Sequence, residues 1–225
     1  NSKTFCLHPF TGLTTRSDGS VRICCRSQII GNIQNNSLRE IWNNETLCRI
    51  RKQVLNNEQP IECISCFNLE SQGVESLRQR HIKGIIPEAR INLYPDATSK
   101  LREDFSMPFE IPTMEIKLNN LCNLKCRYCG PHFSSQWAKE LAIDPPIRTQ
   151  DISNLKSTLI STDLNWLYFT GGEPLISQDH WDMLQDVIDQ GLSKNVTLVY
   201  NSNFTTTRYK NVDVQAVWKI GRAHV

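Results

Sequence analysis

Short apolar runs alternate with longer amphipathic segments through the second half of the chain. Three runs show apolar–polar alternation or β-branched and aromatic enrichment, which predicts strands; they are residues 114–118, 166–169 and 196–200. Three further segments carry apolar residues at helical spacing; they are residues 133–141, 152–160 and 181–188. Strands that alternate with helices predict an α/β fold, with a parallel sheet or barrel and helices outside it.

The first part of the chain shows a different pattern. After a turn, residues 21–23 read as the second arm of a β-hairpin. Ser37 and Glu40 form a capping-box pair, and the apolar residues that follow predict one helix to about residue 55. A second helix is expected over residues 66–80. This pattern predicts a small α+β domain.

These patterns divide the chain into four parts. We expect an N-terminal domain at residues 1–80, a connector with at most a short helix at 81–112, and the strand–helix region at 113–218. Residues 219–225 can be encoded by the start of a common DNA-sequencing adapter, so we expect them to be non-native read-through. The natural chain would then continue with further strands, and this one would have an open sheet edge.

Composition and charge exclude several function classes. Hydrophobic residues make up 39% of the 225 residues, as in ordinary globular proteins. The net charge of +2 gives no reason to expect a nucleic-acid or anionic-membrane partner. No segment approaches the roughly 20 apolar residues that span a bilayer, and the N-terminus lacks an apolar signal region. We therefore expect a cytoplasmic protein.

Nine cysteines change this ordinary picture, because so many thiols in one chain indicate either disulfides or metal ligands. Their odd number, close spacings and the missing export signal favour ligands. Cys122, Cys126 and Cys129 have the spacing C-x3-C-x2-C directly after a predicted strand. Three thiolates on one loop can hold three irons of a [4Fe–4S] cluster and leave the fourth iron open. A zinc ion with a distant fourth ligand is the alternative.

Two more loops follow the next two predicted strands. Residues 171–174 read Gly-Gly-Glu-Pro, where paired glycines permit close backbone approach and Glu173 can receive an ammonium group. Asn201 and Asn203 could bind a ribose or a carboxylate. Taken singly, each is also an ordinary turn. Loops at the carboxyl ends of successive parallel strands are where such barrels place active sites.

Together, the cysteine motif and the Gly-Gly-Glu-Pro turn resemble the radical S-adenosylmethionine (SAM) superfamily. The resemblance covers about residues 113–218 and implies the first half of a partial (β/α)6 barrel. It implies that SAM binds the open iron, that Tyr128 lies against the adenine, and that the turn Gly171, Gly172, Glu173, Pro174 binds the SAM amino group. It also implies a small electron donor such as flavodoxin or ferredoxin. A peptide or protein substrate is suggested, although small molecules also fit.

The N-terminal cysteines predict a second site. Cys6, Cys24, Cys63 and Cys66 would ligate a [4Fe–4S] cluster completely, which suits electron transfer or structure rather than SAM binding. Cys25 is an alternative to Cys24, and zinc is an alternative to the cluster. The pattern resembles the SPASM/twitch auxiliary-cluster domains of radical SAM proteins, although that domain usually follows the barrel and carries more cysteines.

Overall fold

The computed structural model describes residues 3–83, 97–143, 153–160, 164–219 and 222–224. Its main feature is a seven-stranded sheet with the order β3-β2-β1-β4-β5-β6-β9. The strands are β1 Gly12–Thr15, β2 Ser20–Arg22, β3 Ile29–Asn32, β4 Thr113–Lys117, β5 Trp166–Thr170, β6 Thr197–Tyr200 and β9 Arg222–His224. β1 to β3 are antiparallel neighbours, whereas β1, β4, β5, β6 and β9 run parallel. The fold is thus mixed α/β with a mostly parallel sheet.

Short helices surround this sheet. In the N-terminal half they are α1 His8–Thr11, α2 Leu38–Trp42, α3 Glu45–Leu55, η1 Ile61–Cys63, α4 Ile64–Ser71 and α5 Leu77–Ile82. In the second half they are α7 Ser135–Glu140, α8 Ser153–Ile160, η2 Pro174–Ile176, α9 Gln178–Asp189, η3 Leu192–Lys194 and α10 Val214–Trp218. A small hairpin of β7 Arg208–Tyr209 and β8 Val212–Asp213 precedes α10. No described helix is long and apolar enough to cross a bilayer.

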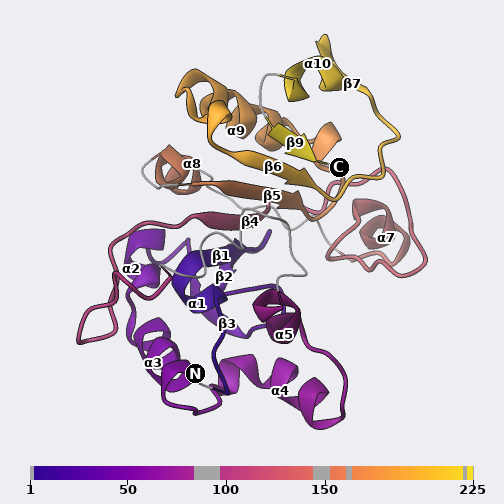
Figure 1. The fold of residues 1–225 in the computed structure, drawn as a ribbon. Coiled ribbons are helices and arrows are strands. Elements are labelled where there is room, and N and C mark those ends of the chain that lie inside the picture. The colour runs from indigo at the N-terminus through magenta and orange to yellow at the C-terminus, as the bar shows by residue number, and fades with distance from the viewer. Residues whose placement is uncertain (1–2, 84–96, 144–152, 161–163, 220–221, 225) are drawn as a thin grey trace.

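The two predicted regions share one sheet. β1 pairs in parallel with β4, with Gly12 opposite Thr113 and Thr15 opposite Ile116. Figure 1 shows β4 between the N-terminal strands and β5. The buried apolar residues also form one core that runs from Leu7 to Val214. The N-terminal region therefore extends the parallel sheet instead of standing apart from it.

The close approach of β1 to β4, which we call the seam, depends on a glycine. A Cβ on Gly12 would lie 2.3 Å from Oγ1 of Thr113 and 3.0 Å from its carbonyl oxygen. The Thr113 hydroxyl donates a hydrogen bond of 3.0 Å to the carbonyl of Thr11, so it is held in place there. Any side chain at position 12 would push β1 away from β4.

The sheet has an apolar and a more polar face because side chains alternate along each strand. Met114 and Ile116 of β4 and Phe169 of β5 are buried in the core with Leu184 of α9. Glu115 and Lys117, which alternate with them, form an ion pair on the opposite face. Lys117 is also the last residue of β4, so this polar face reaches the carboxyl edge of the parallel strands. The predicted site loops begin at that edge.

The predicted strands and hairpin are confirmed, but the two long N-terminal helices are wrong. The first is split into α2 and α3 because the Asn44 side chain accepts from the amide of Leu47 and donates to the Ile30 carbonyl at 2.8 Å. The second is split into α4 and α5 at Gly73, which has φ of +75°, and Ser76 caps the new helix. Local capping outweighs the continuous apolar pattern at both breaks.

Part of the predicted connector packs against the N-terminal helices. Its residues 84–96 lie outside the described residues, but Trp42 donates from Nε1 to the Pro108 carbonyl at 2.8 Å. Arg51, whose side chain is fully buried, donates to the carbonyls of Phe105, Trp42 and Pro9. Burial lowers the pKa of Arg51 to about 10. Residues 97–112 are therefore part of the fold.

Strand β9 lies in the predicted read-through segment, residues 219–225. The origin of that segment stays a prediction.

The seam gives a first prediction. We expect Gly12→Ala to reduce the free energy of unfolding by about 1–3 kcal/mol, because the methyl group overlaps the fixed Thr113 hydroxyl. Chemical denaturation measures this change. Gly130→Ala is the matched control, since no atom lies within 4 Å of its added Cβ. Equal stability of the two variants would contradict the close approach of β1 to β4.

Candidate metal centres

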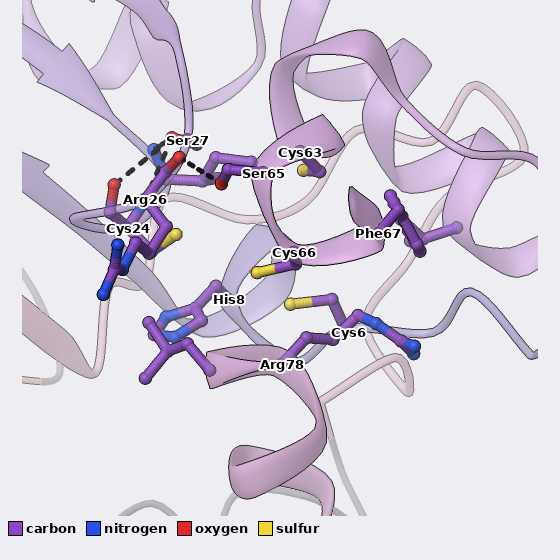
Figure 2. Close-up of a pocket in the computed structure, with 13 residues that line it drawn as sticks. Cys6, His8, Cys24, Arg26, Ser27, Cys63, Ser65, Cys66, Phe67 and Arg78 are labelled. Atoms are coloured by element: carbon purple, nitrogen blue, oxygen red, sulfur yellow. Dashed lines mark hydrogen bonds between the residues drawn. The ribbon is translucent and has the colours of Figure 1, made fainter. Parts of the chain in front are cut away.

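Four cysteines from separate elements line one pocket in the N-terminal region. Cys6 precedes α1, Cys24 follows β2, Cys63 ends η1 and Cys66 lies in α4. Figure 2 shows their thiols around a common space, with His8 beside them. Cys25 is exposed and lines a different pocket together with Glu115 and Tyr168. The structure thus brings together the predicted set with Cys24 as its member.

Hydroxyl groups fix the segments that carry these thiols. The Ser27 hydroxyl accepts from the amides of Ile23 at 3.1 Å and Cys24 at 3.4 Å, which closes the turn after β2. Ser65, between Cys63 and Cys66, donates to the Arg26 carbonyl at 2.9 Å. The turn and α4 are therefore tied together beside the pocket, as the dashed lines in Figure 2 show.

Burial keeps three of these thiols, those of Cys6, Cys24 and Cys63, protonated when no metal is bound. It raises the pKa of Cys6 from 9.0 to about 12. It also raises the pKa of Cys24 and Cys63, with smaller contributions from the neighbouring thiols. Thiolates bind metals, so a metal centre here would form with release of protons.

Cys48 lies apart from this group. It sits in α3, where its sulfur lies 3.6 Å from the Asn43 carbonyl, and it does not line the four-thiol pocket. Its side chain is half-buried in that helix. All nine cysteines are free thiols in the structure, so none forms a disulfide.

The second cysteine group lies on the loop between β4 and α7. Ser135 of α7 accepts from the amide of Cys122 and donates to its carbonyl, both at 3.1 Å. Trp137 donates from Nε1 to the Cys126 carbonyl at 2.9 Å. The first turns of α7 therefore hold the cysteine loop by its backbone and leave the three thiols available.

The thiols of Cys122 and Cys126 affect that of Cys129. The pKa of Cys129 is raised, first by burial and then by the nearby thiols of Cys126 and Cys122. Tyr128 is 93% exposed, so its ring makes little contact with the rest of the chain. A planar ligand could stack on it, which is the role that the resemblance implies; that role stays a prediction.

The Gly-Gly-Glu-Pro turn packs directly against the start of the cysteine loop. A Cβ on Gly172 would lie 2.1 Å from the carbonyl oxygen of Leu121. The Glu173 amide donates to that same oxygen at 2.7 Å, and the Gly172 amide donates to the Asn119 carbonyl at 3.2 Å. Gly171 has φ of +115°, a conformation that favours glycine. The paired glycines thus serve contact between loops.

Glu173 connects this turn to the third loop. Its side chain is 2% exposed, and it accepts from the Ser202 hydroxyl at 2.9 Å, the Asn203 amide at 2.6 Å and the Leu175 amide at 3.0 Å. Pro174 begins η2 just after it. The predicted ammonium-binding carboxylate is therefore engaged with its own chain, and its contact with SAM stays a prediction.

Asn203 brings the third loop to the cysteine loop. Its side-chain amide donates to Asn123 at 2.9 Å and lies 4.0 Å from the sulfur of Cys122. Amide groups beside cluster sulfurs change the reduction potential of a cluster. Asn201 is exposed, and its backbone amide donates to the Phe169 carbonyl at 3.0 Å.

The site also contains residues that the sequence did not single out. Ser135, Trp137 and Ser202 fix the loops, but serine and tryptophan at these positions carry no recognisable spacing. Within the described ranges, no three side chains of His, Cys, Asp or Glu converge closely enough to chelate a single ion. The four N-terminal thiols surround a pocket instead of meeting at a point.

Comparisons with known proteins find matches for parts of the chain. Residues 6–67 match the SPASM iron–sulfur cluster-binding domain. The chain is 29% identical over 90 residues to 7-carboxy-7-deazaguanine synthase of Thermoplasma acidophilum, which covers 40% of this chain and 38% of that one. It is 27% identical over 114 residues to GTP 3′,8-cyclase of Acidothermus cellulolyticus, covering 45% and 30%.

A third relative is molybdenum cofactor biosynthesis protein 1 of Dictyostelium discoideum, 32% identical over 74 residues, or 33% of this chain and 11% of that one. The chain thus matches well under half the length of each of these curated relatives. No solved structure shows significant similarity to it. The chain carries a SPASM iron–sulfur domain and is a distant relative of radical SAM proteins.

The Glu173 contacts give a second prediction. We expect Glu173→Gln to speed hydrogen exchange at the Asn203 amide at least tenfold, or about 1.4 kcal/mol, because a Gln amide places a donor where an acceptor is needed. Exchange measured by NMR on the metal-free protein checks this. Asp189→Asn, on the exposed end of α9, should leave that amide unchanged. Unaltered exchange in Glu173→Gln would show that the carboxylate does not hold the third loop.

The buried thiols give a third prediction. Folded Cys6 keeps its proton to higher pH than an unfolded thiol, so the stability it contributes is full below pH 9 and falls as pH rises towards 12. We expect this loss, about 1.4 kcal/mol per pH unit for such a thiol, in denaturation of the reduced, metal-free protein. Cys6→Ala should show a shallower slope across that range. An identical slope would mean that Cys6 is not buried as a thiol.

Proposed function

We propose that the protein is a radical SAM enzyme whose SAM-binding [4Fe–4S] cluster is held by Cys122, Cys126 and Cys129. The observation that carries this proposal is the joining of three loops at one sheet edge. The cysteine loop follows β4, the glycine turn follows β5 and the asparagine loop follows β6, and hydrogen bonds connect all three. When bound, the reduced cluster would supply the electron that cleaves SAM to methionine and a 5′-deoxyadenosyl radical, which abstracts hydrogen from the substrate.

The residues of the chain position and shield this chemistry. Ser135 and Trp137 hold the loop backbone, which fixes the three thiols relative to one another. Asn203 lies at the sulfur of Cys122, where an amide donor favours the reduced cluster. The Gly171–Pro174 turn would bind the SAM amino group through its backbone, while Glu173 keeps the third loop in place.

The N-terminal pocket is proposed as the site of an auxiliary [4Fe–4S] cluster bound by Cys6, Cys24, Cys63 and Cys66. A cluster takes one thiolate at each of its four corners, whereas a zinc ion draws all four sulfurs to about 2.3 Å from one point. Thiols arranged around a pocket suit the cluster better. Because all its irons would carry protein ligands, this cluster would transfer electrons or stabilise the domain.

The wider setting of the enzyme is also proposed. The parallel strands β4, β5 and β6 with outer helices α8 and α9 are compatible with the first half of a partial (β/α)6 barrel. We propose a flavodoxin- or ferredoxin-like electron donor and a cytoplasmic location. The substrate is proposed to be a peptide or a small molecule, and the geometry of the described residues favours neither.

Variants of single cysteines test the two sites separately. We expect about eight irons per chain after anaerobic reconstitution, about four in Cys126→Ala and about four in Cys66→Ala. Cys25→Ala and Cys48→Ala are matched controls that should keep all of them. Iron analysis and the visible absorption of the clusters provide the measurements. Loss of all iron from folded Cys126→Ala would contradict two separate sites.

Activity is tested on the same samples. With dithionite and SAM, the reconstituted protein should release 5′-deoxyadenosine, whereas Cys126→Ala should release none. An intact cluster that yields no 5′-deoxyadenosine would favour a non-catalytic iron–sulfur module. A colourless protein that contains zinc would favour a zinc-binding module.

A further inference from the structure

A third pocket, separate from the four-thiol pocket and the Cys25 pocket, lies where the N-terminal hairpin meets the site loops. It is lined by the turn after β1, by the end of β4, by the segment after the cysteine motif and by the glycine turn; the residues are Arg16, Ser17, Asp18, Lys117, His132, Phe133 and Gly171. Because Thr15 is opposite Ile116 in the parallel register, the turn at Arg16 and the end of β4 reach the same edge of the sheet. Both halves of the chain therefore contribute to this pocket.

Cationic groups predominate in the pocket. Arg16 and Lys117 contribute a guanidinium and an ammonium group, His132 adds an imidazole, and Asp18 is the one carboxylate in the lining. Asp18 is partly engaged, since it accepts from the Ser20 amide at 2.9 Å. Within the lining, the two cationic side chains outnumber the one carboxylate, which favours an anionic ligand; Glu115, the ion-pair partner of Lys117, is not part of the lining.

The two permanent cations differ in how they are held. Lys117, 9% exposed, lies 3.2 Å from a carboxylate oxygen of Glu115 and 5.7 Å from the centre of the Phe133 ring. The Nε atom of Arg16 is buried and has no hydrogen-bond partner among the described residues. A buried donor without an acceptor costs free energy, which an anion in the pocket would recover.

The pocket also adjoins the proposed SAM site. Gly171 belongs to both, and a Cβ placed on it would lie 3.6 Å from the Cα and Cβ atoms of Lys117. His132 follows Cys129 by three residues. A group bound between Arg16 and Lys117 would thus sit beside the cysteine loop, on the side of the SPASM hairpin.

We propose that this pocket binds an anionic group of the substrate, a carboxylate or a phosphate, through Arg16 and Lys117. The assignment of that anion to the substrate rests on the proposed radical SAM function. Arg16 offers a planar set of donors that matches either anion, and Lys117 adds a second, fixed charge. The SPASM hairpin then acts as part of the substrate site in addition to carrying a cluster ligand.

Binding of inorganic phosphate and of acetate to the reconstituted protein tests this site. We expect isothermal titration calorimetry to detect one binding site for at least one of these anions. Arg16→Gln should raise the dissociation constant of that anion at least tenfold. Arg80→Gln, an exposed arginine of α5 outside the pocket, is the matched control and should bind as the wild type does. Lys117→Arg, which keeps the charge, should also retain binding, whereas Lys117→Gln should not.

A second titration distinguishes a substrate site from the SAM site. This is needed because the methionyl carboxylate of SAM is also an anion that could occupy the pocket. The titration is repeated with saturating SAM, and we expect the anion to bind with unchanged affinity. Exclusion of the anion by SAM, equal affinity in wild type and Arg16→Gln, or no binding of either anion would overturn the proposal. SAM cleavage by the wild-type protein is assayed independently. Cleavage without anion binding would defeat this inference alone, while anion binding without cleavage would defeat the proposed function.

Discussion

The parallel pairing of β1 with β4 is the constraint on which the rest of the structure depends. It places a strand of the SPASM region at the edge of the first strand of the α/β region, with Gly12 directly against Thr113. Because the register is fixed, every loop that leaves the carboxyl edge of these strands has a fixed neighbour. The helices follow the same arrangement, since α2 packs beside α8 and one core extends through both regions.

This shared sheet explains how two thiol sites occupy one small chain. The four-thiol pocket is lined by Ile23 and Cys24, which directly follow β2 at the end of the hairpin. The three-thiol loop leaves β4, the neighbour of β1. On the polar face, Glu115 lines the pocket that contains Cys25, while its ion-pair partner Lys117 lines the cationic pocket. The Glu115–Lys117 ion pair therefore joins a residue of the Cys25 pocket to a residue of the cationic pocket.

The sequence predicted the elements of the second half well, because their apolar periodicity reflects burial against one sheet. It failed where a single polar side chain started a new helix, as Asn44 does by capping α3. The thiol groups were predicted from spacing, but spacing alone left Cys24 and Cys25 as alternatives; the turn closed by Ser27 directs the first towards the pocket. Parallel pairing of β1 with β4 joins residues about a hundred positions apart, and no local pattern encodes such a contact.

Glu173 illustrates how a motif residue can act through its own chain. A carboxylate beside a bound amino acid suggests direct contact with the ammonium group. Here that carboxylate is buried and accepts three hydrogen bonds, two of them from the loop that carries Asn203. Asn203 in turn reaches the sulfur of Cys122. A change at Glu173 would therefore be transmitted to the cysteine loop through the position of Asn203, even if the carboxylate never touched a ligand.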